Sequence, residues 1–433
     1  MALYRVPYGR REIEFELPPG MKGTIAVSKS RPPIKDVSTA IKAALERPVN
    51  SPPMRSLVKR GDKACIVFTD ITRVSPDHQL VPPMLAELEQ AGVRDEDVTL
   101  LCGVGMHRPS TMEEKIEKLG KVVVERYRVV DHEPQNLEAL VDLGTTESGI
   151  PLSVNKIAYE ADLLVATGIV EPHQYAGYSG GAKTVAVGAA GEAMIAYTHG
   201  PNMIDHPGTR LGRIEGNPFQ EAVIEAGRRA RLRFIINVVM DDEKRMLAVR
   251  AGEPRATFSE LVTFARSVYE VPVPQQYDVA VCGVGFPKDS NLYQASRAPS
   301  YLFFAPISVV KPGGVFILPA QCEEGAGKGV GEQRYLEAMK NAKDIPSLLA
   351  DLRRTGYPPG AQRAFVMAKV LEQNEVIVVG CKDPKIVADA KMTPATDMKE
   401  AFEIVKRKLG SELDVLIVPH ALLTLPIVQS AAR

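Results

Sequence analysis

The segment EPHQYAGYSGGAKTVAVG, residues 171–188, holds a histidine and a lysine on either side of three glycines. His173 stands before the glycines, Lys183 stands after them, and His199 follows in the nearby segment THGPN. An imidazole can exchange protons near neutral pH or bind a metal ion, and a lysine amine can form a covalent bond to a reactive group. This combination indicates a reactive site and leaves open which chemistry it serves.

One interpretation of the glycine-rich stretch is a phosphate-binding loop. Residues 177–184, GYSGGAKT, nearly match the pattern G-x-x-x-x-G-K-[ST], in which backbone N–H groups surround a phosphate. Ala182 stands where the pattern has its second glycine, and residues 171–176 separate the loop from the strand expected before it. A P-loop-like nucleotide hydrolase is therefore one alternative, and a solvated turn is another.

The histidines do not have the spacing of a self-contained metal site. The sequence contains neither an H-x-x-x-H nor a C-x-x-C pair of the kind found in zinc sites. A single histidine is enough if an organic cofactor supplies the other ligands, which suits a square-planar ion such as Ni(II).

Polar residues that could do chemistry follow several of the expected strands. Asp70 and Arg73 follow CIVFT, His107 follows VTLLCGVG, and His173 follows LLVATGIV. In the second half of the chain, residues 288–297 follow VAVCGVG. In open α/β sheets ligands bind outside the carboxyl ends of the strands, so these groups are predicted to face one cleft between two domains.

Alternating strands and helices predict parallel sheets covered by helices. Strands are expected over residues 63–70, 97–107 and 161–173, helices over residues 78–92, 110–119, 217–230 and 256–269, and a β-hairpin over residues 233–253. The second half repeats the rhythm with YDVAVCGVG, GGVFILPA, NEVIVVG and LDVLIVP. We therefore expect two α/β domains with mainly parallel sheets.

A chain of 433 residues is too long for one ordinary core and suits two domains. The segment EVPVPQQYDVAVCGVG, with two prolines and a polar pair before a new strand, is the clearest linker signal. We expect an N-terminal α/β domain over residues 1–270 that carries the lysine and histidine motifs. A C-terminal α/β domain over residues 271–433 would contribute substrate-binding residues.

The composition argues against several classes of partner. Lys and Arg together number 53, as do Asp and Glu, so no net charge favours nucleic acid or an anionic membrane surface. The apolar runs are too short to span a bilayer, and the N-terminus lacks the apolar core of a signal peptide. We therefore expect a cytoplasmic protein with a small-molecule partner, and its five scattered cysteines are expected to be reduced core residues.

Five motifs together resemble those of the nickel-dependent lactate racemase family. They occur in that family's order: DITRVSP (70–76), GMHRPST followed by EE (105–114), EPHQYAGYSGGAKTVAVG (171–188), THGPN (198–202) and DSNLYQASRA (289–298). The resemblance implies a racemase or epimerase of a 2-hydroxy acid. It also implies a nickel-pincer nucleotide, a pyridinium-3-thioamide-5-thiocarboxylate mononucleotide carrying Ni(II), which cofactor-biosynthesis proteins would load.

The resemblance further implies a role for each matching residue. Lys183 would form the covalent thioamide link to the cofactor, and His199 would be the protein ligand to nickel. His107 and His173 would be the paired acid and base. The remaining assignments are cofactor-binding Gly177, Gly180 and Gly181, substrate-binding Arg73, Tyr293, Gln294 and Arg297, and Asp70 in support of this set.

The prediction about the substrate comes from a departure from the lactate-racemising pattern. Lactate enzymes of the family carry a lysine where this chain has Arg297, and a tryptophan near the place of Arg363, whereas this chain has no Trp. A bidentate cation and a lost indole favour a substrate larger or more polar than lactate, such as a 2-hydroxy diacid or a sugar acid. Lactate stays the alternative substrate, and a homologue that binds the cofactor without turnover stays the non-enzymatic alternative.

The histidines expected to be structural are His78, His132, His206 and His420.

Overall fold

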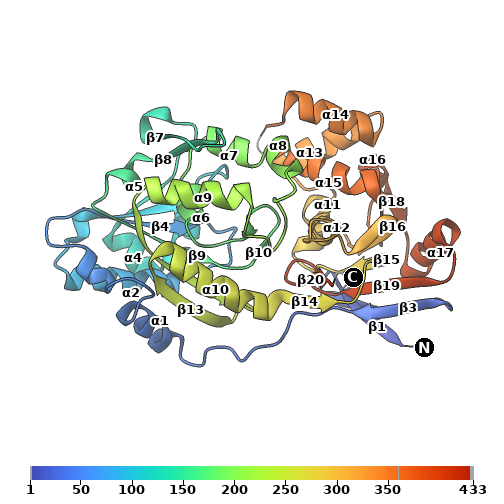
Figure 1. The fold of residues 1–433 in the computed structure, drawn as a ribbon, viewed down its shortest axis with the longest axis horizontal. Helices are drawn as coiled ribbons and strands as arrows, with labels where there is room; N and C mark the ends of the chain where they lie inside the picture. Colours follow the sequence, from blue (N-terminus) through green and yellow to red (C-terminus); the bar gives the residue numbers. More distant parts are fainter. Residues whose placement is uncertain (1, 359, 430–433) are drawn as a thin grey trace. The chain divides into compact units, whose positions relative to one another are not determined.

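The computed structural model describes residues 2–358 and 360–429, which form two compact units, each built on a six-stranded sheet (Figure 1). The central unit comprises residues 30–198 and 214–268. The terminal unit comprises the described residues within 1–29, 199–213 and 269–433. The prediction of an α/β protein with mainly parallel sheets is confirmed.

The sheet of the central unit has the strand order β13-β12-β9-β4-β5-β6. Its strands are β4 (Ala64–Thr69), β5 (Val98–Gly103), β6 (Arg128–Asp131), β9 (Leu163–Ile169), β12 (Leu232–Met240) and β13 (Met246–Gly252). All neighbours are parallel except β12 and β13, which form the hairpin expected over residues 233–253. Every residue of β4 and β9 is buried, as is typical of strands covered by helices on both faces.

Helices cover both faces of this central sheet. One face packs on α1 (Val37–Glu46), α2 (Asp77–Gln90), α3 (Met112–Leu119) and α4 (Lys121–Arg126). On α2 the residues Leu80, Met84 and Leu88 recur at helical spacing and enter this core. The short helices α5 (Lys156–Glu160) and α6 (Lys183–Ala186), together with α9 (Pro218–Arg229), also contact the strands, and the hairpin β7 (Leu140–Thr145) and β8 (Pro151–Asn155) adjoins them.

The sheet of the terminal unit is parallel throughout, with the order β18-β17-β16-β15-β19-β3. Its strands are β3 (Met21–Ile25), β15 (Tyr277–Cys282), β16 (Val310–Pro319), β17 (Glu375–Val379), β18 (Thr393–Ala395) and β19 (Leu413–Val418). Because β3 pairs with β19, residues 1–29, which were expected in an N-terminal domain, lie in the same unit as residues 269–433.

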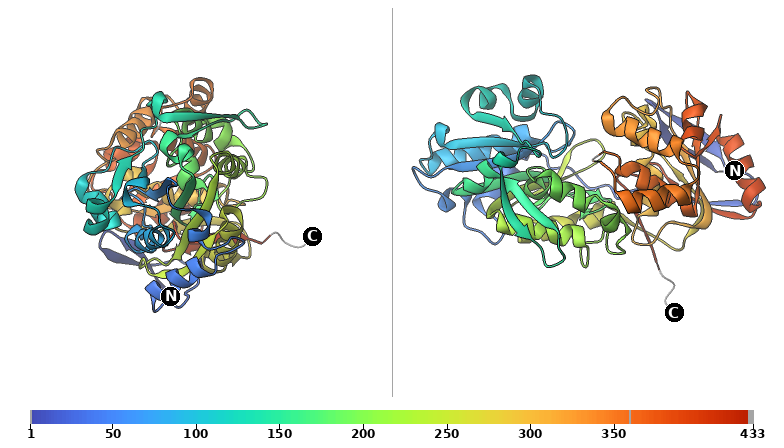
Figure 2. Two further views of the ribbon diagram at one scale, coloured as in Figure 1. Left: turned by 90° about the vertical axis from the view of Figure 1, so that its left-hand side faces the viewer. Right: turned by 90° about the horizontal axis from the view of Figure 1, so that it is seen from above.

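The two faces of the terminal sheet have different covers (Figures 1 and 2). One face forms a core with α17 (Met398–Leu409) and the hairpin of β1 (Leu3–Tyr8) and β2 (Arg11–Glu16), where Phe15 meets Phe402. The strands also contact α12 (Arg297–Phe303) and α15 (Gln362–Gln373). The other elements of this unit are α8 (Pro201–Asp205), α11 (Leu292–Ala295), α13 (Val330–Asn341), α14 (Ile345–Thr355), α16 (Pro384–Asp389), β14 (Glu270–Val273) and β20 (Leu425–Val428).

Most expected elements agree with the structure. The helices expected over residues 78–92, 110–119, 217–230 and 256–269 correspond to α2, α3, α9 and α10 (Pro254–Tyr269). Two expected strands are too long, because β5 ends before the loop that carries His107, and β9 ends before the separate short strand that carries His173. Four cysteines are buried, whereas Cys381 is partly exposed. Among residues 2–358 and 360–429, no helix has the length and apolarity that a membrane span requires.

Candidate active site

Three neighbouring strands of the central sheet carry candidate residues at one edge. The strands β9, β4 and β5 lie side by side and run parallel, so their carboxyl ends share that edge. Asp70 and Arg73 follow β4, His107 follows β5, and His173 follows β9. The sheet thus directs two histidines, one arginine and one carboxylate from the ends of adjacent strands, which is where α/β proteins bind ligands.

Within this group His107 and Asp70 are in direct contact. Nδ1 of His107 lies 2.6 Å from Oδ2 of Asp70, which also accepts a hydrogen bond from the Thr72 hydroxyl. Asp70 is buried, whereas 47% of the His107 side chain is exposed. A carboxylate beside Nδ1 assigns the imidazole proton to that atom, which leaves Nε2 as the acceptor of a proton.

The charges around Asp70 keep it ionised. Burial raises the pKa of this carboxyl, but the hydrogen bond from His107 and the positive charges of His107 and Arg73 outweigh burial, so the net pKa lies below its ordinary value. A buried carboxylate that stays negative can stabilise a positive charge on the imidazole it contacts. The pair is therefore suited to a histidine that gains and loses a proton.

The Nδ1 atom of His173 is an acceptor, in contrast to the Nδ1 atom of His107, which faces a carboxylate. It lies in a short hairpin of β10 (Pro172–His173) and β11 (Gly177–Tyr178), and its Nδ1 accepts hydrogen bonds from the backbone N–H of Tyr175 at 3.3 Å and of Ala176 at 3.2 Å. These donors assign the proton of the neutral ring to Nε2. The ring packs against Tyr175 and Phe219, with centroids 5.8 Å and 6.2 Å away. His107 and His173 therefore present complementary tautomers, one with Nε2 as acceptor and one with Nε2–H as donor.

Two glycines that follow this hairpin are required by the protein's own packing. Gly180 and Gly181 have φ values of +88° and +60°, a region that side chains disfavour. A Cβ on Gly180 would approach Oδ1 of Asn237 to 2.8 Å, and the N–H of Gly181 donates to that oxygen at 2.7 Å. Because the Gly181 amide is paired within the protein, the structure gives it a different partner from the phosphate that the sequence suggested.

Lys183 begins α6, and this short helix is fixed against the same edge. The hydroxyl of Thr184 donates to the carbonyl of Thr167 in β9 at 2.7 Å. Gly188, just after α6, accepts a hydrogen bond from Gly105 at 2.9 Å, and a Cβ on Gly188 would come within 2.9 Å of the Gly103 carbonyl oxygen. The lysine segment is thus packed on the loop that leads to His107.

A buried ion pair supports the loop that carries Asp70 and Arg73, and the sequence analysis missed it. Nζ of Lys118 lies 2.8 Å from Oδ2 of Asp77, and both residues are buried. The same ammonium donates to the backbone carbonyls of Arg73 at 3.2 Å and Ser75 at 2.8 Å. Asp77 directly follows the DITRVSP motif, but nothing in the sequence indicates that Lys118 reaches it from α3.

The remaining candidates lie in the terminal unit. His199 precedes α8, and its carbonyl accepts a hydrogen bond from the Tyr357 hydroxyl at 2.8 Å. Tyr293 and Gln294 form α11, and Arg297 begins α12. Asn291 caps α11 by accepting from the N–H of Gln294 at 2.9 Å, and α11 follows the carboxyl end of β15.

Segment 199–213 is anchored within the terminal unit through Asp205. Its carboxylate pairs with Arg353 of α14 at 2.8 Å and also contacts Lys369 of α15. Burial raises the pKa of Asp205, but its hydrogen bonds and ion pairs with these two cations lower the pKa by a larger amount. The net pKa is therefore below the ordinary value. The segment that begins with His199 is therefore held by charged contacts to two helices.

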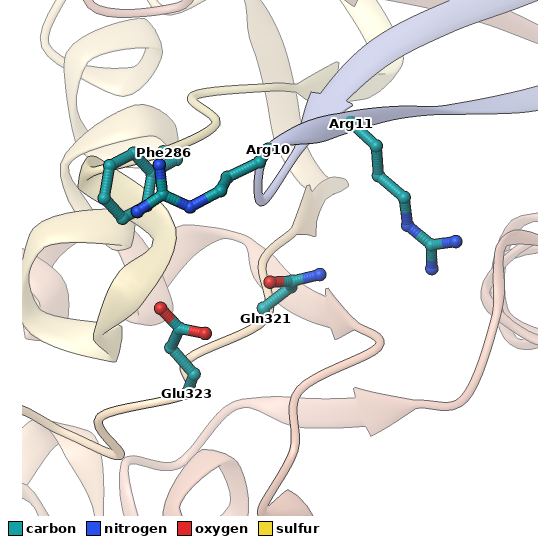
Figure 3. Close-up of a pocket in the computed structure, with 5 residues that line it drawn as sticks. All are labelled: Arg10, Arg11, Phe286, Gln321 and Glu323. Atoms are coloured by element: carbon teal, nitrogen blue, oxygen red, sulfur yellow. The ribbon is translucent and has the colours of Figure 1, made fainter.

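His132 and the pocket in Figure 3 involve residues other than the candidates. His132 is buried, with its ring nitrogens at the carbonyl of Ala190 and the side chain of Asn155, which fits the expected structural role. A pocket of about 290 Å³ in the terminal unit is lined by Arg10, Arg11, Phe286, Gln321 and Glu323 (Figure 3). No candidate site residue is among those five, and Arg10 lies over the Phe286 ring, 3.7 Å from its centroid.

The described residues contain no cluster of three or more His, Cys, Asp or Glu side chains that could hold a metal ion. A metal ion held by these residues would therefore need ligands from a second source. Taken singly, His199 of the terminal unit offers one imidazole, and Lys183 of the central unit offers one amine that can form a covalent bond. A single protein imidazole fits a cofactor that supplies most of its own metal ligands.

Comparison with known proteins gives matches along both units. Residues 8–212 match the family described as Lactate racemase N-terminal domain, and residues 274–425 match Lactate racemase C-terminal domain. A lactate racemase from Thermoanaerobacterium thermosaccharolyticum is 32% identical and covers 97% of this chain and 98% of its own. A lactate racemase from Lactiplantibacillus plantarum is 29% identical and covers 98% of this chain and 99% of its own.

Solved structures agree with these matches. The lactate racemase apoprotein from T. thermosaccharolyticum superposes with a TM-score of 0.89 at 30% identity, covering 99% of this chain and 100% of that chain. A protein from Thermotoga maritima shares the fold, with a TM-score of 0.66 at 20% identity over 91% of this chain and 97% of that chain. With both family domains matched and relatives aligned along nearly its whole length, the chain belongs to the lactate racemase family.

Proposed function

We propose that this protein is an isomerase that inverts the hydroxyl-bearing carbon of a 2-hydroxy carboxylate by reversible hydride transfer. The observation that carries the proposal is the pair of complementary histidines at one sheet edge: His107 with Nδ1 on Asp70, and His173 with Nδ1 on backbone N–H groups. Inversion needs a proton acceptor and a proton donor at the substrate oxygen, and these tautomers supply one of each.

Hydride removal suits this substrate better than proton removal. Taking a proton from the carbon beside a carboxylate would create a second negative charge next to the first, which is unfavourable. Removing hydride from the carbon and a proton from the hydroxyl leaves a neutral keto group instead. When bound, a nickel-pincer nucleotide supplies an electrophilic acceptor for the hydride.

The protein's residues then handle the proton and the carboxylate. Nε2 of His107 accepts the hydroxyl proton, and ionised Asp70 stabilises the imidazolium. His173 serves the opposite enantiomer, and to act as a base at Nε2 it must release its two long backbone hydrogen bonds. Arg73 holds the carboxylate through its planar fork, which keeps the substrate fixed while its carbon inverts.

In this proposal Lys183 and His199 hold different parts of the cofactor. Lys183 forms the covalent link, and His199 is the one protein ligand to nickel, in agreement with the lack of a three-residue metal cluster among the described residues. Cofactor-biosynthesis proteins supply the loaded group. Two observations leave the P-loop interpretation without support. The chain belongs to the lactate racemase family, and Lys183 begins a helix of only four residues.

The substrate is proposed to be larger or more polar than lactate, with Tyr293, Gln294 and Arg297 contacting it. Arg297 donates to Tyr301 at 2.9 Å and approaches Gln294 at 3.5 Å, so its guanidinium lies among the residues of α11 and α12. An arginine there can bind both oxygens of one carboxylate through two N–H groups, whereas a lysine offers a single ammonium.

The deciding experiment is an intact-mass spectrum of protein co-expressed with the cofactor-biosynthesis enzymes. We expect a covalent adduct that Lys183→Ala abolishes, and loss of optical activity of a 2-hydroxy acid by the loaded protein. Absence of an adduct under conditions that load a lactate racemase would refute the cofactor proposal. An adduct without turnover of any 2-hydroxy acid would favour the cofactor-binding homologue.

A further inference from the structure

Arg363 is a buried cation without an acidic partner. It lies in the first turn of α15 and is only 7% exposed. In the part of the chain that the structure describes, its guanidinium forms one hydrogen bond, from Nη1 to the Ser300 hydroxyl at 2.9 Å, and no ion pair. Its Nε is buried without any hydrogen-bond partner.

Such an arrangement is unfavourable for the protein alone. Arginine cannot lose its charge at physiological pH, and an isolated buried charge carries a desolvation cost of several kcal/mol. Ion pairs offset that cost elsewhere in this chain, as for Lys118 with Asp77. Near Arg363 the described residues offer the Ser300 hydroxyl and the Tyr293 ring but no carboxylate, so a bound anion would supply the missing counter-charge.

The free donors of Arg363 have the geometry of a carboxylate receptor. Nη1 is used by Ser300, so the Nε–H and the Nη2 hydrogens remain on one edge of the planar group. That edge offers two parallel N–H bonds, which match the two oxygens of a carboxylate. A hydroxyl could take one of these bonds but would not neutralise the charge.

Arg363 lies beside the proposed substrate residues. Its Cζ is 5.6 Å from the centroid of the Tyr293 ring, and Ser300 lies one helical turn after Arg297 on α12. The helices α12 and α15 contact each other within the terminal unit, and Figure 1 labels both there together with α11. The guanidinium of Arg363 is therefore near the ring of Tyr293, which is proposed to contact the substrate.

We propose that Arg363 binds a second carboxylate of the substrate, so that the preferred substrates are 2-hydroxy dicarboxylates. The inference rests on the proposed function and adds the substrate class. That second carboxylate supplies the counter-charge that Arg363 lacks. Monocarboxylates such as lactate leave that charge unpaired, and sugar acids offer only hydroxyls to it.

The kinetic test compares cofactor-loaded wild type with Arg363→Met, which keeps an unbranched stem about as long as the aliphatic part of arginine and removes the charge. Malate and 2-hydroxyglutarate are the probes, with lactate and gluconate as the contrasting substrates. We expect the wild type to have its highest kcat/KM with one of the diacids, and Arg363→Met to lower that value by about 10- to 100-fold. Its kcat/KM for lactate should change by less than about threefold.

Arg363→Lys and Arg407→Met complete the set. Lysine keeps the charge but not the fork, so it should recover part of the diacid activity. Arg407 is an exposed arginine of α17, and its replacement should alter no substrate preference. Lactate or gluconate as the best wild-type substrate, or diacid kinetics that do not respond to Arg363→Met, would overturn the proposal.

A second measurement does not depend on turnover. In the apoprotein, malate should raise the melting temperature of the wild type and not that of Arg363→Met, with lactate as the control ligand. Without ligand, Arg363→Met should melt at a temperature equal to or higher than that of the wild type, because an uncompensated charge has been removed. A lower melting temperature together with equal malate effects would assign Arg363 a purely structural role. If diacids bind through Arg363 but no 2-hydroxy acid is racemised, the proposed function fails while the dicarboxylate site stands.

Discussion

His107 and Asp70, from the ends of two adjacent parallel strands, meet at 2.6 Å between Nδ1 and Oδ2. The carboxylate is buried and its pKa is lowered, while nearly half of the imidazole is exposed. The pair thus combines a fixed negative charge with a ring that a ligand can reach. In the proposed mechanism this relationship separates two roles: Asp70 sets the tautomer and charge of the ring, and His107 exchanges the proton.

Replacing Asp70 by Asn should therefore impair turnover without unloading the cofactor. An amide in this position can stabilise the other tautomer and cannot balance an imidazolium, so kcat should fall by about 10²- to 10⁴-fold. The measurements are racemisation kinetics and nickel content. Thr72→Val, which removes the hydroxyl that donates to the same carboxylate, is the control and should cost far less. Equal kcat in Asp70→Asn and the wild type would contradict the role of Asp70.

The same carboxylate predicts a pH dependence of stability. The folded pKa of Asp70 lies below its unfolded value of about 3.9. Its contribution is therefore fully present above that value and is lost as the pH falls through the folded pKa, where the native carboxylate becomes protonated. In urea titrations below pH 5, wild type should lose more stability than Asp70→Asn. Parallel acid profiles for the two proteins would show that Asp70 does not contribute.

The sequence predicted the strand ends and the helices better than the organisation of the chain. His107, Asp70 and His173 could be placed at one edge because strand, loop and helix alternate regularly, and parallel strands end on the same side. The pairing of β3 with β19 is not encoded in any local pattern, since the short and mostly exposed strand β3, MKGTI, carries no signal for one sheet over the other. The units therefore do not follow the order of the sequence.

Other parts of the site were beyond sequence reasoning because they depend on long-range side-chain contacts. The glycines at 180 and 181 suggested a phosphate, but Asn237 from a distant strand occupies the Gly181 amide. Lys118 looks like an ordinary surface lysine of an amphipathic helix, yet it is buried against Asp77. The spacing of residues in a helix predicts on which face of the helix a side chain lies. It does not predict which residue of a neighbouring loop that side chain contacts.

Breaking the ion pair under the 70–76 loop should be costly. Lys118→Met leaves the buried carboxylate of Asp77 without its counter-charge, and we expect a loss of about 3–5 kcal/mol in the free energy of unfolding. It also removes the donor to the Arg73 and Ser75 carbonyls, so KM should rise in the folded, loaded variant. The double variant with Asp77→Asn should recover part of the stability, and strictly additive losses would show that the pair is not coupled.

His132 provides a stability test near neutral pH. Burial lowers its pKa, and the hydrogen bond to the Ala190 carbonyl offsets this only in part. The unfolded chain, with a histidine pKa of about 6.5, then binds more protons than the native state below that pH. Stability should fall as the pH drops from 7 through 6.5 toward the folded pKa. Chemical denaturation of His132→Gln should show a shallower pH dependence, whereas His78→Gln, at an exposed position, should keep the wild-type slope.

The attachment of segment 199–213 leads to the last prediction, in which covalent loading and nickel retention are separated. His199→Ala should keep the Lys183 adduct in the mass spectrum but lose nickel on gel filtration, because the link and the metal ligand come from different residues.

Asp205 should affect nickel binding through His199. Its carboxylate ties the segment to Arg353 and Lys369, so Asp205→Asn loosens the backbone that carries the imidazole. We expect Asp205→Asn to release nickel severalfold faster than wild type while its adduct mass is unchanged. Asp351→Asn, which removes an exposed carboxylate paired with Arg354 on the same helix as Arg353, is the matched control and should retain nickel like the wild type. Equal nickel release from Asp205→Asn and Asp351→Asn would mean that the ion pairs of Asp205 do not position His199.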